Sequence, residues 1–169
     1  RVKSFDFTNV IANTGRISKT MQRSGTTLNA DITGARKLFL VVSEAGDNNF
    51  YDHADWINPV IYKPNGDSLL LTSLKSASTS GNTGTVQINK SFDGKPLTVN
   101  GKVYGNGFGT SSPSLLEFNL PEGYTRFSAF CGLDDEIMNS NIGTTVEFLV
   151  FTKNPMNIAK SSVKITLSE

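Results

Sequence analysis

The chain has 169 residues, enough for one domain with a substantial core. Its 16 Lys and Arg nearly balance its 15 Asp and Glu, and the net charge of +1 argues against a nucleic-acid or acidic-lipid surface. No run of 18 apolar residues exists and there is one Cys, so we expect neither a membrane-inserted helix nor an intrachain disulfide. Ser, Thr, Asn and Gly make up 66 residues, which favours strands and turns over helices.

Short apolar runs, most of them alternating with polar residues, predict strands along the chain. The predicted strands are residues 27–32, 37–43, 126–131, 145–151 and 163–167. Residues 37–43 form a continuous apolar run, which is typical of a strand buried on both faces. Residues 1–35 are less regular, and we interpret them as the first strands of the same sandwich.

Turn signals separate these runs. They lie at residues 64–67, 80–84, 93–96, 100–101 and 121–123. Asn100-Gly101 predicts a two-residue hairpin, because both residues tolerate the positive φ of a type I′ turn. Short strands spaced by turns predict an all-β fold, a β-sandwich of the jelly-roll kind. We assign residues 1–160 to this single domain, and residues 161–169 to the start of a strand or linker leading to a following domain.

A polar and aromatic loop is predicted at residues 46–56. It holds three acids, the only His, the only Trp and one Tyr, namely Asp47, Tyr51, Asp52, His53, Asp55 and Trp56. Such a loop suits a sugar, whose C–H face packs on an aromatic ring while its hydroxyls bond to planar acids and amides. The alternative is that Trp56 belongs to the core and the acids cap turns.

The same three acids also allow a Ca²⁺ site, because hard cations bind carboxylate and carbonyl oxygens. We assign this metal to Asp47 and Asp52, although the spacing does not match an EF-hand loop. One His and one Cys cannot by themselves close a zinc site. His53 is interpreted as a hydrogen-bonding loop residue.

Two further segments are candidates for ligand contact. Residues 105–112 are rich in glycine and include Asn106 and Ser111, so the backbone could approach a ligand there; the alternative is a tight inter-strand loop. Three consecutive acids begin at Asp134, where they could hold a cation or a sugar hydroxyl. Their alternative is a solvated turn, or pairing with Arg126 or a Lys.

Catalytic signals are scarce. The single His and single Cys lie far apart and no Gly-x-Ser-x-Gly elbow is present, which argues against a catalytic triad. Fifteen acids supply carboxylate pairs in any chain, so they do not by themselves indicate a glycosidase. Cys131 lies in an apolar run and is predicted to be a buried free thiol. We therefore expect that the domain is not an enzyme by itself.

Several motifs occur in an order that resembles a known family. They are residues 38–42, 51–56, 94–97, 107–110, 113–114, 124–129, 132–135 and 146–150. Over residues 36–153 the chain resembles the NPCBM domain family, the novel putative carbohydrate-binding modules of carbohydrate-binding module family 51. The resemblance implies a galactose-binding-like sandwich that binds galactose-containing glycans without catalysis, as a monomeric module beside the catalytic domain of a bacterial glycoside hydrolase. It also implies a secreted, periplasmic or cell-surface location, and structural calcium in some members.

The resemblance has one departure. Relatives carry Gly-x-Gly-x-His-Ala-x-Ser in the central loop, and here Ser111 stands in the His place. A hydroxyl can donate and accept a hydrogen bond but cannot stack or carry charge. We expect Tyr51, Asp55, Trp56, Asn106, Ser111 and Asp134 to converge on the glycan at one end of the sandwich. The alternative is a structural or docking domain, which predicts a buried Trp56 and an exposed apolar patch.

Overall fold

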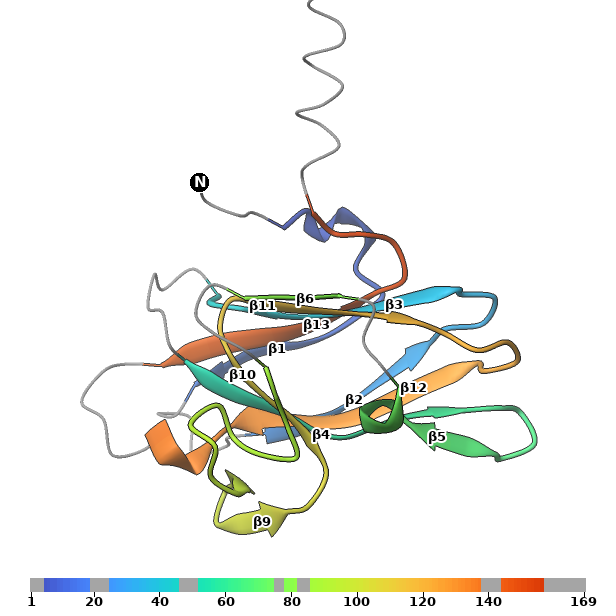
Figure 1. The fold of residues 1–169 in the computed structure, drawn as a ribbon. Coiled ribbons are helices and arrows are strands. Elements are labelled where there is room, and N and C mark those ends of the chain that lie inside the picture. The colour runs from blue at the N-terminus through green and yellow to red at the C-terminus, as the bar shows by residue number, and fades with distance from the viewer. Residues whose placement is uncertain are drawn as a thin grey trace, which may run out of the picture.

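The computed structural model describes residues 5–18, 25–45, 52–74, 78–81, 86–137 and 144–156. Two antiparallel sheets lie face to face (Figure 1). The first sheet has, in spatial order, β1 (Ala12–Ser18), β13 (Thr145–Phe151), β3 (Lys37–Ser43), β11 (Ser114–Asn119) and β6 (Ser78–Gly81). The second has β2 (Gly25–Asp31), β12 (Arg126–Leu133), β4 (His53–Tyr62), β10 (Gly107–Ser111) and β7 (Gln87–Ile88), with β5 (Ser68–Leu70) beside β4.

This strand order confirms the predicted jelly roll. Setting aside the short strands, the chain crosses to the other sheet at every step except from β4 to β10, which are neighbours in one sheet, and gives the orders β1-β13-β3-β11 and β2-β12-β4-β10. Eight strands interleaved in this way form the double Greek key of a jelly roll. Short 3-10 turns accompany the strands: η1 (Phe7–Asn9), η3 (Leu71–Ser73) and η4 (Asp135–Ile137). No helix among the described residues is long and apolar enough to cross a membrane.

The predicted strands at residues 27–32, 37–43, 126–131 and 145–151 are confirmed, whereas residues 161–169, including the predicted strand at 163–167, lie outside the described part. The hairpin at Asn100-Gly101 joins β8 (Leu97–Val99) to β9 (Lys102–Tyr104). Both turn residues have positive φ, 53° and 81°, as a type I′ turn requires. Cys131 is a buried free thiol, as predicted.

The main core lies between the sheets, and Trp56 is at its centre. The indole is fully buried and meets the ring of Phe148 on the opposite sheet edge-on, with centroids 4.9 Å apart. It also lies edge-on to Phe127 of the neighbouring strand, 6.2 Å away. The structure therefore corrects the expectation that Trp56 stacks on a sugar, because a ring enclosed on all sides has no face to offer. The core alternative for Trp56 is confirmed.

Two predicted loops are also corrected. His53 to Trp56 begins β4 and is not part of a loop, since Ala54 and Trp56 face the core while His53 and Asp55 face the other way. Gly107–Ser111 is the strand β10, buried along its whole length and paired with β4. Its Gly109 lets another segment lie directly on the strand: an added Cβ would collide with the carbonyl oxygen of Lys90 and would lie 2.7 Å from the Cα of Ser91.

Candidate functional site

The outer face of the second sheet is different at its two ends. At one end a segment containing the turn 91–95 and the hairpin β8–β9 covers the strands, and a polar cluster forms beneath it. At the other end, near the tight turns, the same strands are open to solvent. We call these the covered end and the open end.

At the covered end, strand register brings polar side chains together. Ser111 on β10 pairs with His53 on β4, and Asp134 follows the end of β12 with its N–H donating to the carbonyl of His53. One row further along, Asp55 lies between Gly109 and Gly132. Since paired residues of antiparallel strands share a face, His53, Asp55 and Ser111 face the same covered space.

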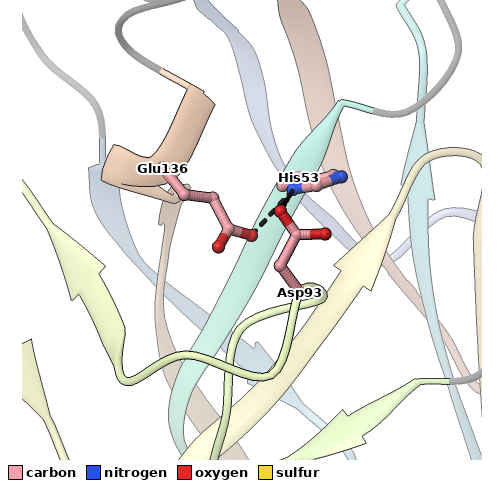
Figure 2. Close-up of side chains that lie close together, drawn as sticks. All are labelled: His53, Asp93 and Glu136. Atoms are coloured by element: carbon pink, nitrogen blue, oxygen red, sulfur yellow. Dashed lines mark hydrogen bonds and ion pairs between the residues drawn. The ribbon is translucent and has the colours of Figure 1, made fainter.

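His53 is the centre of the cluster. Its Nδ1 lies 2.7 Å from Glu136 Oε2 and 3.8 Å from Asp93 Oδ2, as Figure 2 shows. The imidazole side chain is 12% exposed and that of Glu136 is 7% exposed, whereas Asp93 on the covering turn is 51% exposed. One nitrogen and two carboxylate oxygens thus converge on one spot that solvent reaches past Asp93.

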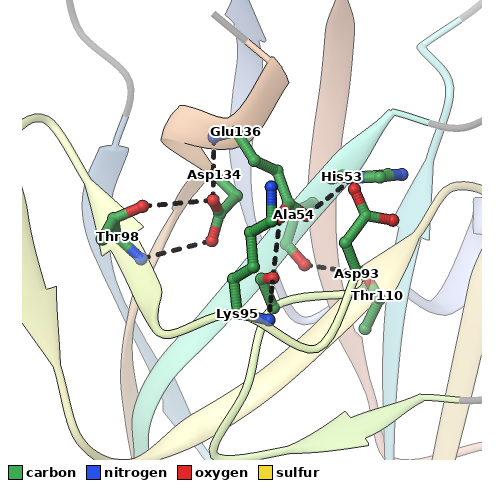
Figure 3. A network of polar contacts seen from close by, with 9 residues as sticks. His53, Ala54, Asp93, Lys95, Thr98, Thr110, Asp134 and Glu136 are labelled. Atoms are coloured by element: carbon green, nitrogen blue, oxygen red, sulfur yellow. Dashed lines mark hydrogen bonds and ion pairs between the residues drawn. The ribbon is translucent and has the colours of Figure 1, made fainter.

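Asp134 and Asp135 hold the covering hairpin in place. Asp134 accepts bonds from the N–H and hydroxyl of Thr98 and from the N–H of Glu136 (Figure 3). Asp135 accepts from the N–H groups of Asn100 and Gly101 at the hairpin turn. Asp134 is 0% exposed and is therefore not in a solvated turn, whereas Asp135 bonds to the hairpin at a partly exposed position. Among the described residues, neither acid forms an ion pair with Arg126 or a Lys.

Glu136 holds the turn that precedes the hairpin. The hydroxyl of Ser91 donates to Glu136 Oε1 at 2.8 Å and accepts from the N–H of Lys95 at 3.1 Å. The turn is therefore fixed against η4, with Asp93 directed toward His53 (Figure 2). The sequence marks Glu136 only as one of three consecutive acids that could hold a cation. Its contact with His53 and the positions of Asp93 and Ser91 are not predicted, because they depend on how the covering segment folds back.

Asp55 is the most unusual group of the cluster. It is fully buried, and neither carboxyl oxygen has a hydrogen bond of standard geometry. The carboxyl of Asp134 nevertheless lies close enough to raise the pKa of Asp55. Burial raises its pKa to about 11, and the neighbouring carboxylates of Asp134, Glu136 and Asp135 add to the shift. The hydroxyl of Ser111, 3% exposed, is likewise without a partner.

At the open end, a groove of about 590 Å³ crosses the three strands β2, β12 and β4. In the strand register, Arg126 of β12 lies opposite Asp31 of β2 on one side and opposite Tyr62 of β4 on the other. Its guanidinium carbon lies 4.1 Å from the centre of the Tyr62 ring, and its Nη1 donates to Asn29 Oδ1 at 3.3 Å. Lys63 and Thr33 also line this groove.

Asp31 is held as a carboxylate in this groove. The hydroxyl and the N–H of Thr33 both donate to Oδ1, at 2.6 and 2.9 Å, and these bonds hold the pKa of Asp31 below its ordinary value. A second groove of about 680 Å³ continues from the first, sharing Thr33 and Thr125. Planar acids, an amide, a guanidinium and an aromatic ring are therefore accessible along one continuous surface.

The comparison with known families decides the identity. The profile of the NPCBM/NEW2 domain matches residues 6–62 and 67–166. The chain belongs to the NPCBM/NEW2 domain family. The resemblance noted from the motifs is confirmed, and the family indicates a non-catalytic carbohydrate-binding module whose partner is a glycan. No curated protein and no solved structure matches the chain.

The structure of this NPCBM domain brings some of the predicted site residues together and places others elsewhere. Asp55, Ser111 and Asp134 do come together, but all three are buried at the covered end. Asn106 lies further along, where its amide donates to Thr72 Oγ1 and Asn89 Oδ1. Tyr51 and Asp47 lie outside the described residues, and the calcium assignment to Asp47 and Asp52 stays a prediction.

Proposed function

We propose that this NPCBM domain binds galactose-containing glycans through the groove at the open end, as a non-catalytic module of a secreted bacterial glycoside hydrolase. The observation that supports the location is the accessible Tyr62–Arg126 pair flanked by Asn29 and Asp31. The galactose preference, the parent hydrolase and the secreted, periplasmic or cell-surface location follow from the resemblance to carbohydrate-binding module family 51.

Size favours the open end over the covered end for a sugar. A groove of about 590 Å³ is within the range of small-ligand sites. Asp55 and Asp134, by contrast, are 0% exposed, and a hexose could reach them only if the hairpin were displaced. The open end needs no such rearrangement, because Asn29, Asp31 and Arg126 are already exposed.

The chemistry of the groove also suits a sugar. The guanidinium of Arg126 is a planar donor and Asp31 a planar acceptor, so each can bond two neighbouring hydroxyls. The Tyr62 ring positions the guanidinium by lying under it. Because the second groove continues from the first, a longer glycan has a path past Thr33 and Thr125. Shallow sites of this kind bind modestly, with Kd roughly in the micromolar-to-millimolar range.

A docking function has less support. The five exposed large apolar side chains of the described residues are Phe7, Ile11, Leu70, Ile88 and Val103. They belong to five different segments of the chain: η1, the residues before β1, and the strands β5, β7 and β9. The burial of Trp56 agrees with a docking domain, but a sugar-binding module with Trp56 in its core would show the same burial. It therefore does not favour docking.

Calorimetric titration with galactosides tests the proposal. We expect Tyr62→Ala and Arg126→Ala each to weaken binding about 10-fold or more, the loss of one good hydrogen bond or stacking contact. The chain offers a matched control, since Lys102 lies over the Tyr104 ring at 5.3 Å outside the groove. Tyr104→Ala and Lys102→Ala should leave the affinity unchanged. No binding of any glycan at millimolar concentration would contradict the function, and unchanged binding by both groove variants would contradict the site.

A further inference from the structure

We propose that His53, Asp93 and Glu136 bind one divalent transition-metal cation, of which Zn²⁺ is the reference case. This site is separate from the glycan groove and does not depend on it. It would fasten the covering turn to β4 and η4.

The donor atoms are within reach of a single ion. His53 Nδ1 and one oxygen each of Asp93 and Glu136 lie within 4.8 Å of one another. Zn²⁺ binds imidazole nitrogen and carboxylate oxygen at about 2.0–2.2 Å, so ligand atoms around one ion are separated by roughly 3–4 Å. The present separations of 2.7 and 3.8 Å from Nδ1 require only small side-chain adjustments.

A buried group beside this cluster lacks a partner. Ser111, the register partner of His53, is 3% exposed and its hydroxyl has no hydrogen bond. Asp55 faces the same space two positions along β4, where its carboxyl lies beside that of Asp134. Buried polar atoms are nearly always satisfied in folded proteins, so the Ser111 hydroxyl indicates a missing partner at this end.

The charge at the covered end also lacks compensation. Four further acids gather there around the neutral Asp55, namely Asp93, Asp134, Asp135 and Glu136. Among the described residues, none of these four forms an ion pair with a Lys or Arg, and the ion pairs at the covered end are those of His53 with Asp93 and Glu136. Buried carboxylates are normally paired or bound to metals. A divalent cation would supply the positive charge that the protein does not.

The imidazole selects the class of metal. Ca²⁺ prefers sites made of oxygen atoms, whereas imidazole suits zinc and its neighbours in the first transition series. One His and one Cys cannot close a zinc site alone, but carboxylates are also zinc ligands, and here two of them complete a three-residue set. Asp93 is 51% exposed, so water can occupy the remaining position.

Metal binding should be measured on the full chain after chelator treatment, without any glycan. Calorimetry is expected to show one Zn²⁺ per chain, with Ca²⁺ and Mg²⁺ much weaker. At 100 times its Kd, Zn²⁺ should raise the melting temperature by about 5 °C or more. Co²⁺ substituted for Zn²⁺ should show visible d–d absorption bands that imidazole and carboxylate ligands produce.

Variants separate this site from chance binding. His53→Ala should abolish the Zn²⁺-dependent rise in melting temperature, and Asp93→Asn, at a half-exposed position, should weaken Zn²⁺ binding at least 10-fold without impairing folding. Glu117→Gln, which changes an acid paired with Lys37 on the other sheet, is the control that should bind normally. His53 is the only His of the chain, so few other sites compete. Absence of one-to-one binding, stronger binding of Ca²⁺ than of Zn²⁺, or binding unaffected by His53→Ala and Asp93→Asn would overturn the proposal. Because no glycan is present, failure here leaves the glycan proposal untouched.

Discussion

The two ends of one sheet face use the same strands for different purposes. At the open end, β2, β12 and β4 present Asp31, Arg126 and Tyr62 to solvent in one row. At the covered end the same three strands carry Gly25, Gly132 and Asp55 in one row. Beside this row, Gly109 on β10 leaves room for the covering segment, whereas large polar side chains form the surface of the open end. The two ends therefore differ in the accessibility of their polar side chains more than in the number of polar residues, and our proposals of a sugar site at one end and an ion site at the other rest on this difference.

Both ends of the sheet rest on the same core, and Trp56→Ala is expected to have the largest effect on it. Removing the indole leaves a cavity between the sheets, and we expect a loss of about 3–5 kcal/mol of unfolding free energy. Chemical denaturation measures this loss. A core role predicts that glycan affinity of the remaining folded fraction is unchanged, whereas a contact role predicts weaker binding with little loss of stability.

A methyl group added at Gly109 should push the covering segment away from the sheet. Gly109→Ala places a Cβ against the backbone of Lys90 and Ser91, which must move away. We expect a destabilisation of about 2 kcal/mol, as is usual for overpacking. The displaced Ser91 should also weaken metal binding, because its hydroxyl positions Glu136. Gly94→Ala is a suitable contrast, because nothing lies near an added Cβ there, although its φ of 84° adds some backbone strain. Equal metal affinity in the Gly109 variant and the native chain would show that the turn does not form the site.

The bonds from Asp135 to the β8–β9 hairpin are expected to contribute least to stability. Asp135→Ala removes the acceptor of the N–H groups of Asn100 and Gly101, which lie at the surface and can bond to water instead. We expect a loss of about 1 kcal/mol. Hydrogen exchange should show faster exchange of these two amides, while the amides of β2 stay protected. Unchanged exchange at both amides would mean that the turn residues hold the hairpin without the acid.

Much of the fold could be predicted from the sequence because it follows local patterns. Residues 37–43 are apolar throughout and Asn100-Gly101 specifies its own turn, so both needed no tertiary information. Residues 52–56 were harder to assign. Their alternation of polar and apolar residues fits a loop as well as a strand with one covered face, so the pattern alone does not separate the two. The alternation places Trp56 in the core and Asp55 outside it, and the strand interpretation explains both positions.

The site was less predictable, for a different reason. Asp55, Ser111 and Asp134 were recognised as a group, but whether they lie at the surface depends on residues 89–104 folding back over Gly109. Asp93 and Glu136 reach His53 across 40 and 83 positions of sequence, and no local pattern encodes such contacts. The groove was missed because Tyr62, Arg126 and Asp31 belong to three separate strands and become neighbours only through register.

The central claim is that the sugar binds at the open end and not at the covered end. The most direct measurement is a galactoside titration of two variants side by side, Arg126→Ala and His53→Ala, both checked for folding. We predict about 10-fold weaker binding for Arg126→Ala and native affinity for His53→Ala. Native affinity for Arg126→Ala together with lost binding for His53→Ala would contradict the account and move the sugar to the covered end.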